Sequence, residues 1–361
     1  MIPSMLSTSP MDVFRYSVRS PDARSGLHSV MRLASYALML LAACLLSACG
    51  PAKRPAEPDN LFWPLPPDPP KIKYIQSIYS EDDIGRVYSF MEKLFGKDYH
   101  DSLVRPYGVF ARTGAMAVAD VTLRRVLLFD LTSKRLTIVG DDGTLRIPSA
   151  VVIDSSGRIY VADGPGGKVA LYDASGRYLT AFLMKDSRPI ALALNEQAGK
   201  LYVIDGDGHR ILVFGLDGRR IAVIGKAGRG AGEFNFPIDI AIDRSGLLYV
   251  LDARNFRVQI LEEDGSYLRS FGSAGDVPGS FANPKGIALD SKGHIYVTDA
   301  AYSNFQIFDS TGNILLFVGS LGPRPGELHL PAGISIDEQD RIYVADQLNG
   351  RVQIFQYLDS Q

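Results

Sequence analysis

One short pattern occurs six times in this chain of 361 residues, and it constrains the fold more than any other feature. Each copy is an apolar run that ends in aspartate, and the closing aspartates follow one another at intervals of 43, 42, 47, 47 and 47 residues. The copies are Met116–Asp120, Ile159–Asp163, Leu201–Asp205, Leu248–Asp252, Ile295–Asp299 and Ile342–Asp346. A period of about forty-five residues, with apolar runs separated by glycine and aspartate turns, is typical of a β-propeller. We therefore expect six blades.

Each repeat divides into four strand-like runs, as the fourth repeat shows. Its runs are Ile238–Asp243, Leu247–Leu251, Arg257–Leu261 and Tyr267–Phe271. The first three are apolar at nearly every position, which is expected of strands that neighbouring blades cover on both faces. Two of the turns between the runs contain Ser-Gly or Asp-Gly, which is typical of hairpins. Residues 106–361 are therefore expected to form an all-β, six-bladed β-propeller.

The sixth repeat is one strand short. After its third run, Arg351–Gln356, five residues remain, which is too few for a turn and a further strand. The segment Lys71–Tyr79 is strand-like and belongs to none of the repeats. If it pairs with the last blade, the ring closes and no strand edge is exposed there. We therefore expect the N-terminal segment to supply the outer strand of the sixth blade.

Between this segment and the first repeat, the sequence predicts one short N-terminal helix. Apolar side chains recur there with the i, i+3, i+4, i+7 and i+8 spacing of an amphipathic helix, and Gly96 ends the pattern. These residues are Val87, Phe90, Met91, Leu94 and Phe95. We expect the helix to pack on the propeller, with docking of a partner as the alternative. Residues 71–105 thus hold the closing strand and the helix.

Residues 1–48 are interpreted as an export signal, with Met31 as an alternative start. Arg32 precedes an apolar run that is too short for a permanent membrane-spanning helix and that ends in small residues. The last residues, Leu46-Ser-Ala-Cys49, resemble the lipobox of bacterial lipoproteins, in which the cysteine is acylated and starts the mature chain. With Gly50 next, this resemblance implies lipidation of Cys49 and a place in the outer membrane facing the periplasm. A cleaved signal with an incidental cysteine is the alternative.

Residues 49–70 are expected to be the lipidated cysteine and a proline-rich linker. Eight prolines lie between residues 51 and 70, and proline favours an extended, semi-rigid spacer. The run Leu61-Phe-Trp63 interrupts this composition and contains the only tryptophan. The preferred interpretation is that this run pins the linker to the domain surface, and the alternative is that it docks a partner.

Several phrases of the later repeats resemble NHL repeats. They are Pro284–Asp290, His294–Asp299, Arg351–Phe355 and the Gly232-Glu-Phe run between two repeats. The resemblance covers the six repeats and is clearest from the fourth repeat onward. It implies a six-bladed propeller of the NHL type. NHL propellers bind protein, RNA or peptide, and a few related propellers are lyases or hydrolases, so the resemblance implies the fold and not the activity.

A basic or amide residue follows the closing aspartate by five positions in every repeat. The pairs are Asp120/Arg125, Asp163/Lys168, Asp205/Arg210, Asp252/Arg257, Asp299/Asn304 and Asp346/Arg351. One interpretation is a ring of carboxylates that binds calcium. The preferred one is structural, because the aspartate ends one strand and its partner begins the next, so that the two can hydrogen-bond across the hairpin.

Function is expected where the repeats differ. The connections between the second and third strands and those between successive blades share one end of a propeller, and the longest of them lie there. At that end, the residues around the start of the inner strands vary from blade to blade. They are Arg105, Tyr107, Arg188, Asp239 and Lys285. We expect these five to hold an anionic or polyhydroxylated ligand at the mouth of the central channel; a solvated rim of charges is the alternative.

Metal, cofactor and cysteine chemistry are disfavoured. The two cysteines, Cys44 and Cys49, both lie in the apolar run near the N-terminus, so the repeats contain no cysteine nucleophile or thiolate metal site. The histidines after that run are too dispersed among the repeats for a zinc site; they are His100, His209, His294 and His329. Lys and Arg number 38 against 40 Asp and Glu, which disfavours nucleic-acid binding. We expect no metal, no cofactor and no catalytic residue.

Two functions remain open. The preferred one is a non-catalytic binding platform, attached to a membrane of the cell envelope by its lipid, that engages a protein or a glycan through the loop-rich face. The alternative is a periplasmic lyase or lactone hydrolase with its site at the channel mouth. An enzyme of that kind needs a metal cage or an acid–base pair among the channel-facing side chains, and the sequence offers few candidates.

Overall fold

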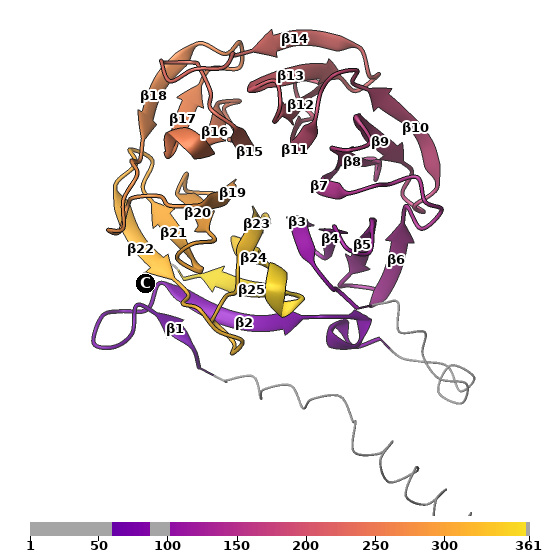
Figure 1. Ribbon diagram of the computed structural model, residues 1–361. Coiled ribbons are helices and arrows are strands. Elements are labelled where there is room, and N and C mark those ends of the chain that lie inside the picture. The colour runs from indigo at the N-terminus through magenta and orange to yellow at the C-terminus, as the bar shows by residue number, and fades with distance from the viewer. Residues whose placement is uncertain (1–59, 87–101, 359–361) are drawn as a thin grey trace, which may run out of the picture. The chain divides into compact units, whose positions relative to one another are not determined.

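The chain forms a six-bladed β-propeller in the computed structural model, which describes residues 60–86 and 102–358. Six antiparallel sheets surround a central axis, and each of the first five has four strands that follow the chain from the axis outward (Figure 1). The six blades that the repeat predicts are confirmed. Within the described residues the secondary structure is strands and short 3₁₀ turns.

The strands of the first five blades have similar lengths. Blade 1 contains β3 (Pro106–Arg112), β4 (Ala115–Asp120), β5 (Arg125–Asp130) and β6 (Arg135–Val139). Blade 2 contains β7 (Pro148–Ile153), β8 (Ile159–Asp163), β9 (Lys168–Tyr172) and β10 (Tyr178–Leu183). Blade 3 contains β11 (Pro189–Asn195), β12 (Lys200–Asp205), β13 (Arg210–Gly215) and β14 (Arg220–Ile224). Blade 4 contains β15 (Pro237–Ile242), β16 (Leu248–Asp252), β17 (Arg257–Leu261) and β18 (Tyr267–Phe271). Blade 5 contains β19 (Pro284–Leu289), β20 (Ile295–Asp299), β21 (Asn304–Phe308) and β22 (Ile314–Val318).

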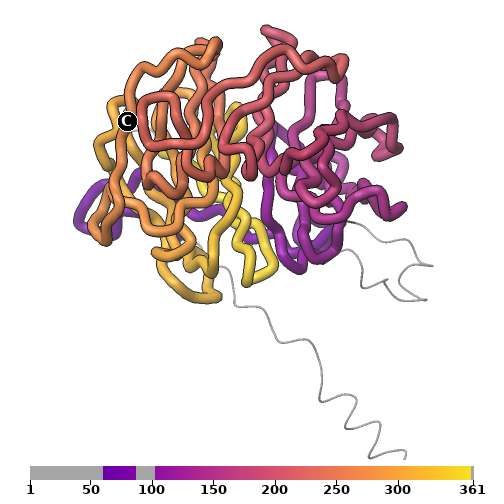
Figure 2. Tube along the Cα trace, turned by 45° about the horizontal axis from the view of Figure 1, so that its top comes forward, coloured from indigo at the N-terminus to yellow at the C-terminus, as the bar shows by residue number. Residues whose placement is uncertain are grey.

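The sixth blade takes its outer strand from the N-terminal side of the chain, as predicted. Its sheet contains β23 (Pro331–Ile336), β24 (Arg341–Asp346), β25 (Arg351–Tyr357) and then β2 (Ile72–Ile78). Strand β2 runs antiparallel to β25, with Ile78 opposite Val352. Figures 1 and 2 both place the indigo N-terminal strand against the yellow last blade. Ile72, Tyr74 and Ile78 are buried there, so the ring closes through apolar packing as well as through backbone pairing.

A fifth, two-residue strand that the sequence pattern does not indicate extends this blade. Strand β1 (Phe62–Trp63) pairs with β2, and the Trp63 ring meets Phe355 edge-on at a centroid distance of 5.7 Å. Leu61 and Trp63 pack against the apolar cluster between blades 5 and 6. The aromatic run in the linker is therefore pinned to the domain, which was the preferred interpretation.

Three 3₁₀ turns complete the described secondary structure: η1 (Glu81–Ile84), η3 (Ala253–Asn255) and η4 (Gln347–Asn349). The amphipathic helix predicted from Val87 to Phe95 lies outside the described residues, as do the export signal and Cys49. Within residues 60–86 and 102–358, no helix is long and apolar enough to cross a membrane.

The apolar cores lie between neighbouring blades. All five residues of β16 are buried, whereas four of the five residues of the outer strand β14 are exposed. The cluster between blades 3 and 4, for example, joins Tyr202 and Ile211 to Ile240 and Val250. A middle strand has a blade on each side, so both of its faces are apolar. This is why the repeats contain continuous apolar runs and not alternating ones.

The six closing aspartates have a structural role. In every blade the carboxylate accepts a hydrogen bond from a backbone N–H just before the proline that starts the inner strand. In blade 4, for example, Oδ1 of Asp252 accepts from the N–H of Asn235 at 2.7 Å. The carboxylate thus fixes the loop that enters the blade. The sequence pattern does not predict this contact. No group of three or more metal-binding side chains is placed to hold an ion among the residues described, so the calcium interpretation gains no support.

The predicted hydrogen bond across the hairpin forms in blades 3, 4 and 6. There the arginine Nε donates to the closing aspartate at 2.7–3.0 Å; the pairs are Arg210/Asp205, Arg257/Asp252 and Arg351/Asp346. The prediction is wrong for blades 1, 2 and 5. Among the described residues no hydrogen bond joins Asn304 to the Asp299 carboxylate, and the basic residues of blades 1 and 2 reach other acceptors. Arg125 pairs with Asp141, and Lys168 donates to the carbonyl of Thr144.

Candidate functional site

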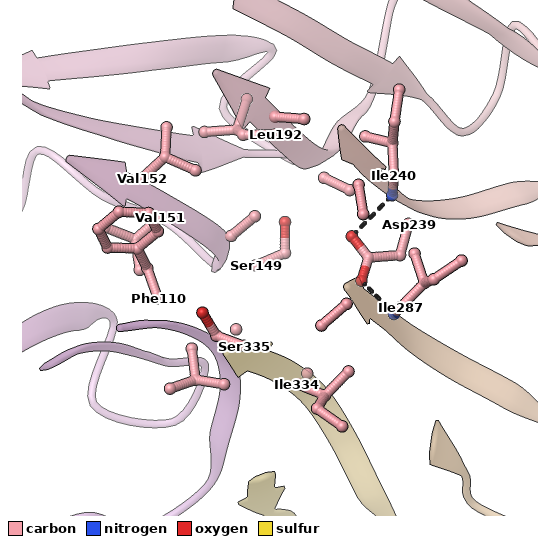
Figure 3. Close-up of a pocket in the computed structure, with 18 of the residues that line it drawn as sticks. Phe110, Ser149, Val151, Val152, Leu192, Asp239, Ile240, Ile287, Ile334 and Ser335 are labelled. Carbon is pink, nitrogen blue, oxygen red and sulfur yellow. Dashed lines mark hydrogen bonds between the residues drawn. The ribbon is translucent and has the colours of Figure 1, made fainter. Parts of the chain in front are cut away.

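The inner strands of the six blades surround a central channel. They are β3, β7, β11, β15, β19 and β23, and each begins at the end of the propeller where the inter-blade loops lie. The channel contains a cavity of about 240 Å³. Most of the residues that line it have aliphatic side chains, and the close-up shows Val151, Leu192 and Ile334 among them (Figure 3). Few polar side chains line this cavity, so each of them matters for what can bind.

Asp239 is the carboxylate that lines this cavity. Its Oδ1 accepts a hydrogen bond from the N–H of Ile240 and its Oδ2 accepts one from the N–H of Ile287, both at 2.9 Å (Figure 3). Burial raises the pKa of the Asp239 carboxyl to about 7, although these two N–H groups favour the ionised form. Near neutral pH the group therefore exists in both protonation states.

Asp239 also ties two blades together, and two serines do the same elsewhere in the channel. The hydroxyl of Ser149 donates to the carbonyl of Ile190 at 3.0 Å, which joins blades 2 and 3. The hydroxyl of Ser335 accepts from the N–H of Ala111 at 3.0 Å, which joins blades 6 and 1. With Asp239 between blades 4 and 5, a polar side chain bridges every second junction of the ring. These three groups contribute to closing the ring and also face the cavity.

Tyr107 and Lys285 line the same cavity. Burial raises the pKa of the Tyr107 phenol; the charge of Asp239 adds to this rise and the charge of Arg188 opposes it. Burial lowers the pKa of Lys285, whereas the negative charge of Asp299 acts to raise it. The structure thus brings Tyr107, Asp239 and Lys285 together in one cavity, as a phenol, an acid and an amine.

The remaining two predicted site residues lie outside the cavity. Arg105 and Arg188 are exposed, and neither lines the channel. Arg188 reaches Asp207 at 3.8 Å, a long contact between two exposed side chains. Both arginines precede the proline that starts an inner strand, so they belong to the rim. The five residues therefore divide into three in the channel and two at its edge.

Parts of the sequence match two known families. Residues 185–255 match a family described as a 6-bladed β-propeller, and residues 281–308 and 328–355 match the NHL repeat. The chain contains NHL repeats. They lie in blades 5 and 6, where the resemblance in the sequence is clear. No curated protein matches the sequence.

Solved structures share the fold of this NHL propeller. A streptogramin B lyase is 16% identical, with a TM-score of 0.52, over 71% of this chain and 94% of that one. A virginiamycin B lyase from Staphylococcus aureus is 13% identical, with a TM-score of 0.54, over 80% and 100%. A structural genomics protein of unknown function from Bacteroides thetaiotaomicron is 18% identical, with a TM-score of 0.59, over 79% and 75%. At these identities the likeness concerns the fold alone.

The histidines of the NHL propeller do not gather. Nδ1 of His209 accepts a hydrogen bond from the N–H of Phe236 at 2.7 Å. At the other end of the propeller, Nδ1 of His294 lies 2.7 Å from Oδ2 of Asp290. His329 gives its backbone N–H to Asp346, and His100 lies outside the described residues. The described histidines thus have separate local roles.

The sequence-based interpretation missed Ser149 and Ser335. Both follow an initial proline by one to four positions, as Tyr107 and Asp239 do. Polar residues just after that proline, in strands that are otherwise apolar, are the signal that would have found them.

Proposed function

We propose that this NHL propeller is a non-catalytic binding platform, held in the cell envelope by a lipid on Cys49, that binds a partner through its loop-rich face. The observation that carries the proposal is a set of three loops of the same construction on this face. They are residues 225–236, 272–283 and 319–330. Each contains one parallel bridge, between Ala227 and Phe234, Ala274 and Phe281, and Leu321 and Leu328.

A buried glutamine holds each loop in place. Its Nε2 donates to a loop carbonyl and its Oε1 accepts from a loop N–H, at 2.6–3.1 Å; the glutamines are Gln259, Gln306 and Gln353. A loop whose backbone is fixed by such contacts loses little conformational entropy when a partner binds. Pre-organised loops therefore favour recognition.

Apolar side chains are exposed on two of these loops. Val277 is 60% exposed and Leu321 is 68% exposed, and Phe317 on the adjoining strand β22 is 49% exposed. An exposed apolar cluster on rigid loops is typical of an interaction site. The charged rim residues Arg105 and Arg188 lie on the same face, which suits a partner with both apolar and anionic groups.

The test is capture of a partner from envelope extracts, followed by titration against face-specific variants. Arg188→Ala with Lys285→Ala removes positive charge from the loop-rich face, and Arg244→Ala with Lys292→Ala removes it from the opposite face. We expect the first pair to weaken binding at least tenfold and the second to leave it unchanged. Binding through the rim also weakens as salt rises.

Equal loss in both pairs, or loss only with the second pair, places the site away from the loop-rich face and contradicts the proposal. Melting temperatures of both variants within a few degrees of the wild type show that the fold is retained. Val277→Asp with Leu321→Asp provides an independent probe, because it removes apolar contact and leaves the rim charges in place.

An acid–base enzyme is the second candidate, and one observation favours it. Asp239 has a pKa of about 7 and shares the cavity with the Tyr107 phenol, which suits proton transfer near neutral pH. Two of the solved structures that share the fold are lyases. Turnover of lactones by the purified protein, with a pH profile that inflects near 7 and is lost in Asp239→Asn, would support this candidate over the platform.

A further inference from the structure

Blade 5 lacks an arginine that its two neighbours share. In blade 4, Nη2 of Arg257 donates to the carbonyls of Gly230 and Glu233 at 2.8 and 2.9 Å, and Nε donates to Asp252. In blade 6, Arg351 makes the same three contacts to Arg324, Glu327 and Asp346 at 2.7–2.8 Å. Each guanidinium thus fills the space between the closing aspartate and the inter-blade loop.

Asn304 occupies the equivalent position in blade 5, opposite Asp299 in the hairpin. The loop is built in the same way, and its corresponding carbonyls are those of Val277 and Ser280. Within the described residues, each accepts one hydrogen bond, from the N–H of Ser280 and from Nε2 of Gln306 respectively, and neither accepts a guanidinium. Oδ1 of Asn304 is buried and has no hydrogen-bond partner among the described residues.

A pocket of about 300 Å³ is present beside this asparagine. Its lining includes Asn304, Gln306, the loop residues 276–278 and the exposed Phe317 and Leu321. It shares no lining residue with the central channel. The pocket is therefore separate from the channel, but it contains the exposed apolar side chains of the loop-rich face, and the proposal below rests on the proposed binding role of that face. A failed probe titration refutes the arginine pocket alone, whereas unchanged partner binding in the face-specific variants refutes the platform.

A second substitution in blade 5 places an aromatic ring at the pocket. Asn255 of blade 4 and Asn349 of blade 6 donate to loop carbonyls, and the equivalent residue of blade 5 is Tyr302. The Tyr302 hydroxyl keeps this contact by donating to the carbonyl of Gly275, and its ring lines the pocket. An aromatic face attracts a guanidinium.

Two aspartates add negative charge that suits a guanidinium, one beside Asn304 in the hairpin and one in the pocket wall. Asp299 is fully buried, and among the described residues its hydrogen-bond donors are backbone N–H groups such as those of Ala282 and Ala301. In blades 4 and 6 the equivalent aspartate also receives an arginine. Asp276 adds a further acidic side chain to the pocket wall. The wall of the pocket thus contains the Asp276 carboxylate and Val277, and the buried Asp299 next to Asn304 lacks the arginine that the equivalent aspartate receives in the other two blades.

We propose that the blade 5 pocket binds an arginine side chain of a partner protein, in the place that Arg257 and Arg351 fill in the neighbouring blades. The planar guanidinium has donors for two carbonyls at once, which a lysine ammonium does not match in geometry. The apolar stem of the arginine then lies along Phe317 and Leu321. The partner is a protein segment that presents arginine beside apolar residues.

The test uses the full chain with N-acetyl-arginine methylamide as the probe. N-acetyl-citrulline methylamide is the matched control, since it has nearly the same shape and no charge. Calorimetric titration is expected to give saturable binding of the arginine probe and at least tenfold weaker binding of the citrulline probe. Equal affinity for the two probes, or no binding of either, overturns the proposal.

Variants at Asn304 locate the binding. Asn304→Arg supplies the missing guanidinium from within, so we expect a higher melting temperature and loss of probe binding. Asn304→Lys, which copies Lys168 of blade 2, is the second variant if the arginine does not fit beside Tyr302. Probe binding that persists in a folded Asn304→Arg or Asn304→Lys protein shows that it occurs elsewhere and overturns the assignment.

Blade 4 offers a positive control. Arg257→Asn vacates the same arginine position there, next to Asn255 in place of a tyrosine, so we expect a lower melting temperature and a second, weaker site for the arginine probe. If Arg257→Asn gains no site while its fold is retained, the vacated arginine position does not make a binding pocket, and the proposal fails.

Discussion

Oδ2 of Asp239 on β15 accepts a hydrogen bond of 2.9 Å from the backbone N–H of Ile287 on β19. A side chain that faces the central cavity therefore joins blades 4 and 5. Because its pKa lies near 7, this tie changes its charge within the physiological pH range. Ser149 and Ser335 form comparable ties at two other junctions without a titratable group.

Asp239 is predicted to make stability depend on pH. Its pKa is about 7 in the folded protein against an ordinary value of 3.8, because burial disfavours the charge. The folded state therefore holds the proton more tightly than the unfolded state, and the free energy of unfolding falls as pH rises from about 4 to about 7. In Asp239→Asn this contribution is absent. Denaturant titrations should therefore show that the free energy of unfolding of the variant, relative to that of the wild type, increases as the pH rises over that range.

The matched control for this prediction is Asp264→Asn. Hydrogen bonds from Ser266 lower the pKa of Asp264, so its contribution to stability is lost only as pH falls below about 4. Its difference from the wild type should stay constant between pH 4 and 7. A constant difference for Asp239→Asn as well would contradict the assignment of a raised pKa.

The closing strand is predicted to be sensitive at its buried positions. Ile78 is fully buried against the first and last blades, so Ile78→Ala should lower the free energy of unfolding by about 2–5 kcal/mol. Ile75 on the same strand is 40% exposed, and Ile75→Ala should cost less than about 1 kcal/mol. Equal small effects in denaturant titrations would mean that β2 does not close the ring.

A side chain at Gly333 is predicted to destabilise the fold. A Cβ there would lie 2.6 Å from the carbonyl oxygen of Tyr107, which is backbone of the neighbouring blade. Gly333→Ala should therefore cost about 1–3 kcal/mol, because the two inner strands must move apart. A Cβ at Gly275 would lie 2.8 Å from Oγ of Ser280, which can rotate away, and 3.0 Å from its Cβ, with no backbone atom among its closest contacts, so Gly275→Ala should cost less. Thermal unfolding of the two variants compares them, and equal melting temperatures would show that the inner strands separate easily.

Cys49, which lies outside the described residues, is predicted to carry the lipid. Mass spectrometry of protein extracted from membranes should find acyl chains on this residue, because it ends the lipobox-like run. Cys49→Ala should release the protein from the membrane or stall its processing, whereas Cys44→Ala should have no effect. A mature chain that begins at another residue and has no modification would contradict the prediction.

The number of blades and the position of most strands follow from the sequence because their causes are local. The run Leu248–Asp252 is apolar throughout since a middle strand is covered on both faces, and the Ser-Gly turn before it defines where the strand starts. The closing strand Ile72–Ile78 also follows, because a blade that is one strand short requires a partner for its edge. Neither inference needs knowledge of which side chains meet.

The composition of the channel was decided by tertiary structure. In all six blades the pairing of the inner strand shifts within the first few residues after its initial proline, for example between Pro237 and Asp239. Such an irregularity changes which face a following side chain occupies, so alternation in the sequence does not reveal what points to the axis. Tyr107 and Asp239 follow the proline and enter the cavity, whereas Arg105 and Arg188 precede it and remain on the rim. The sequence by itself thus determined the repeat, and the packing of six inner strands determined which of its variable residues share one site.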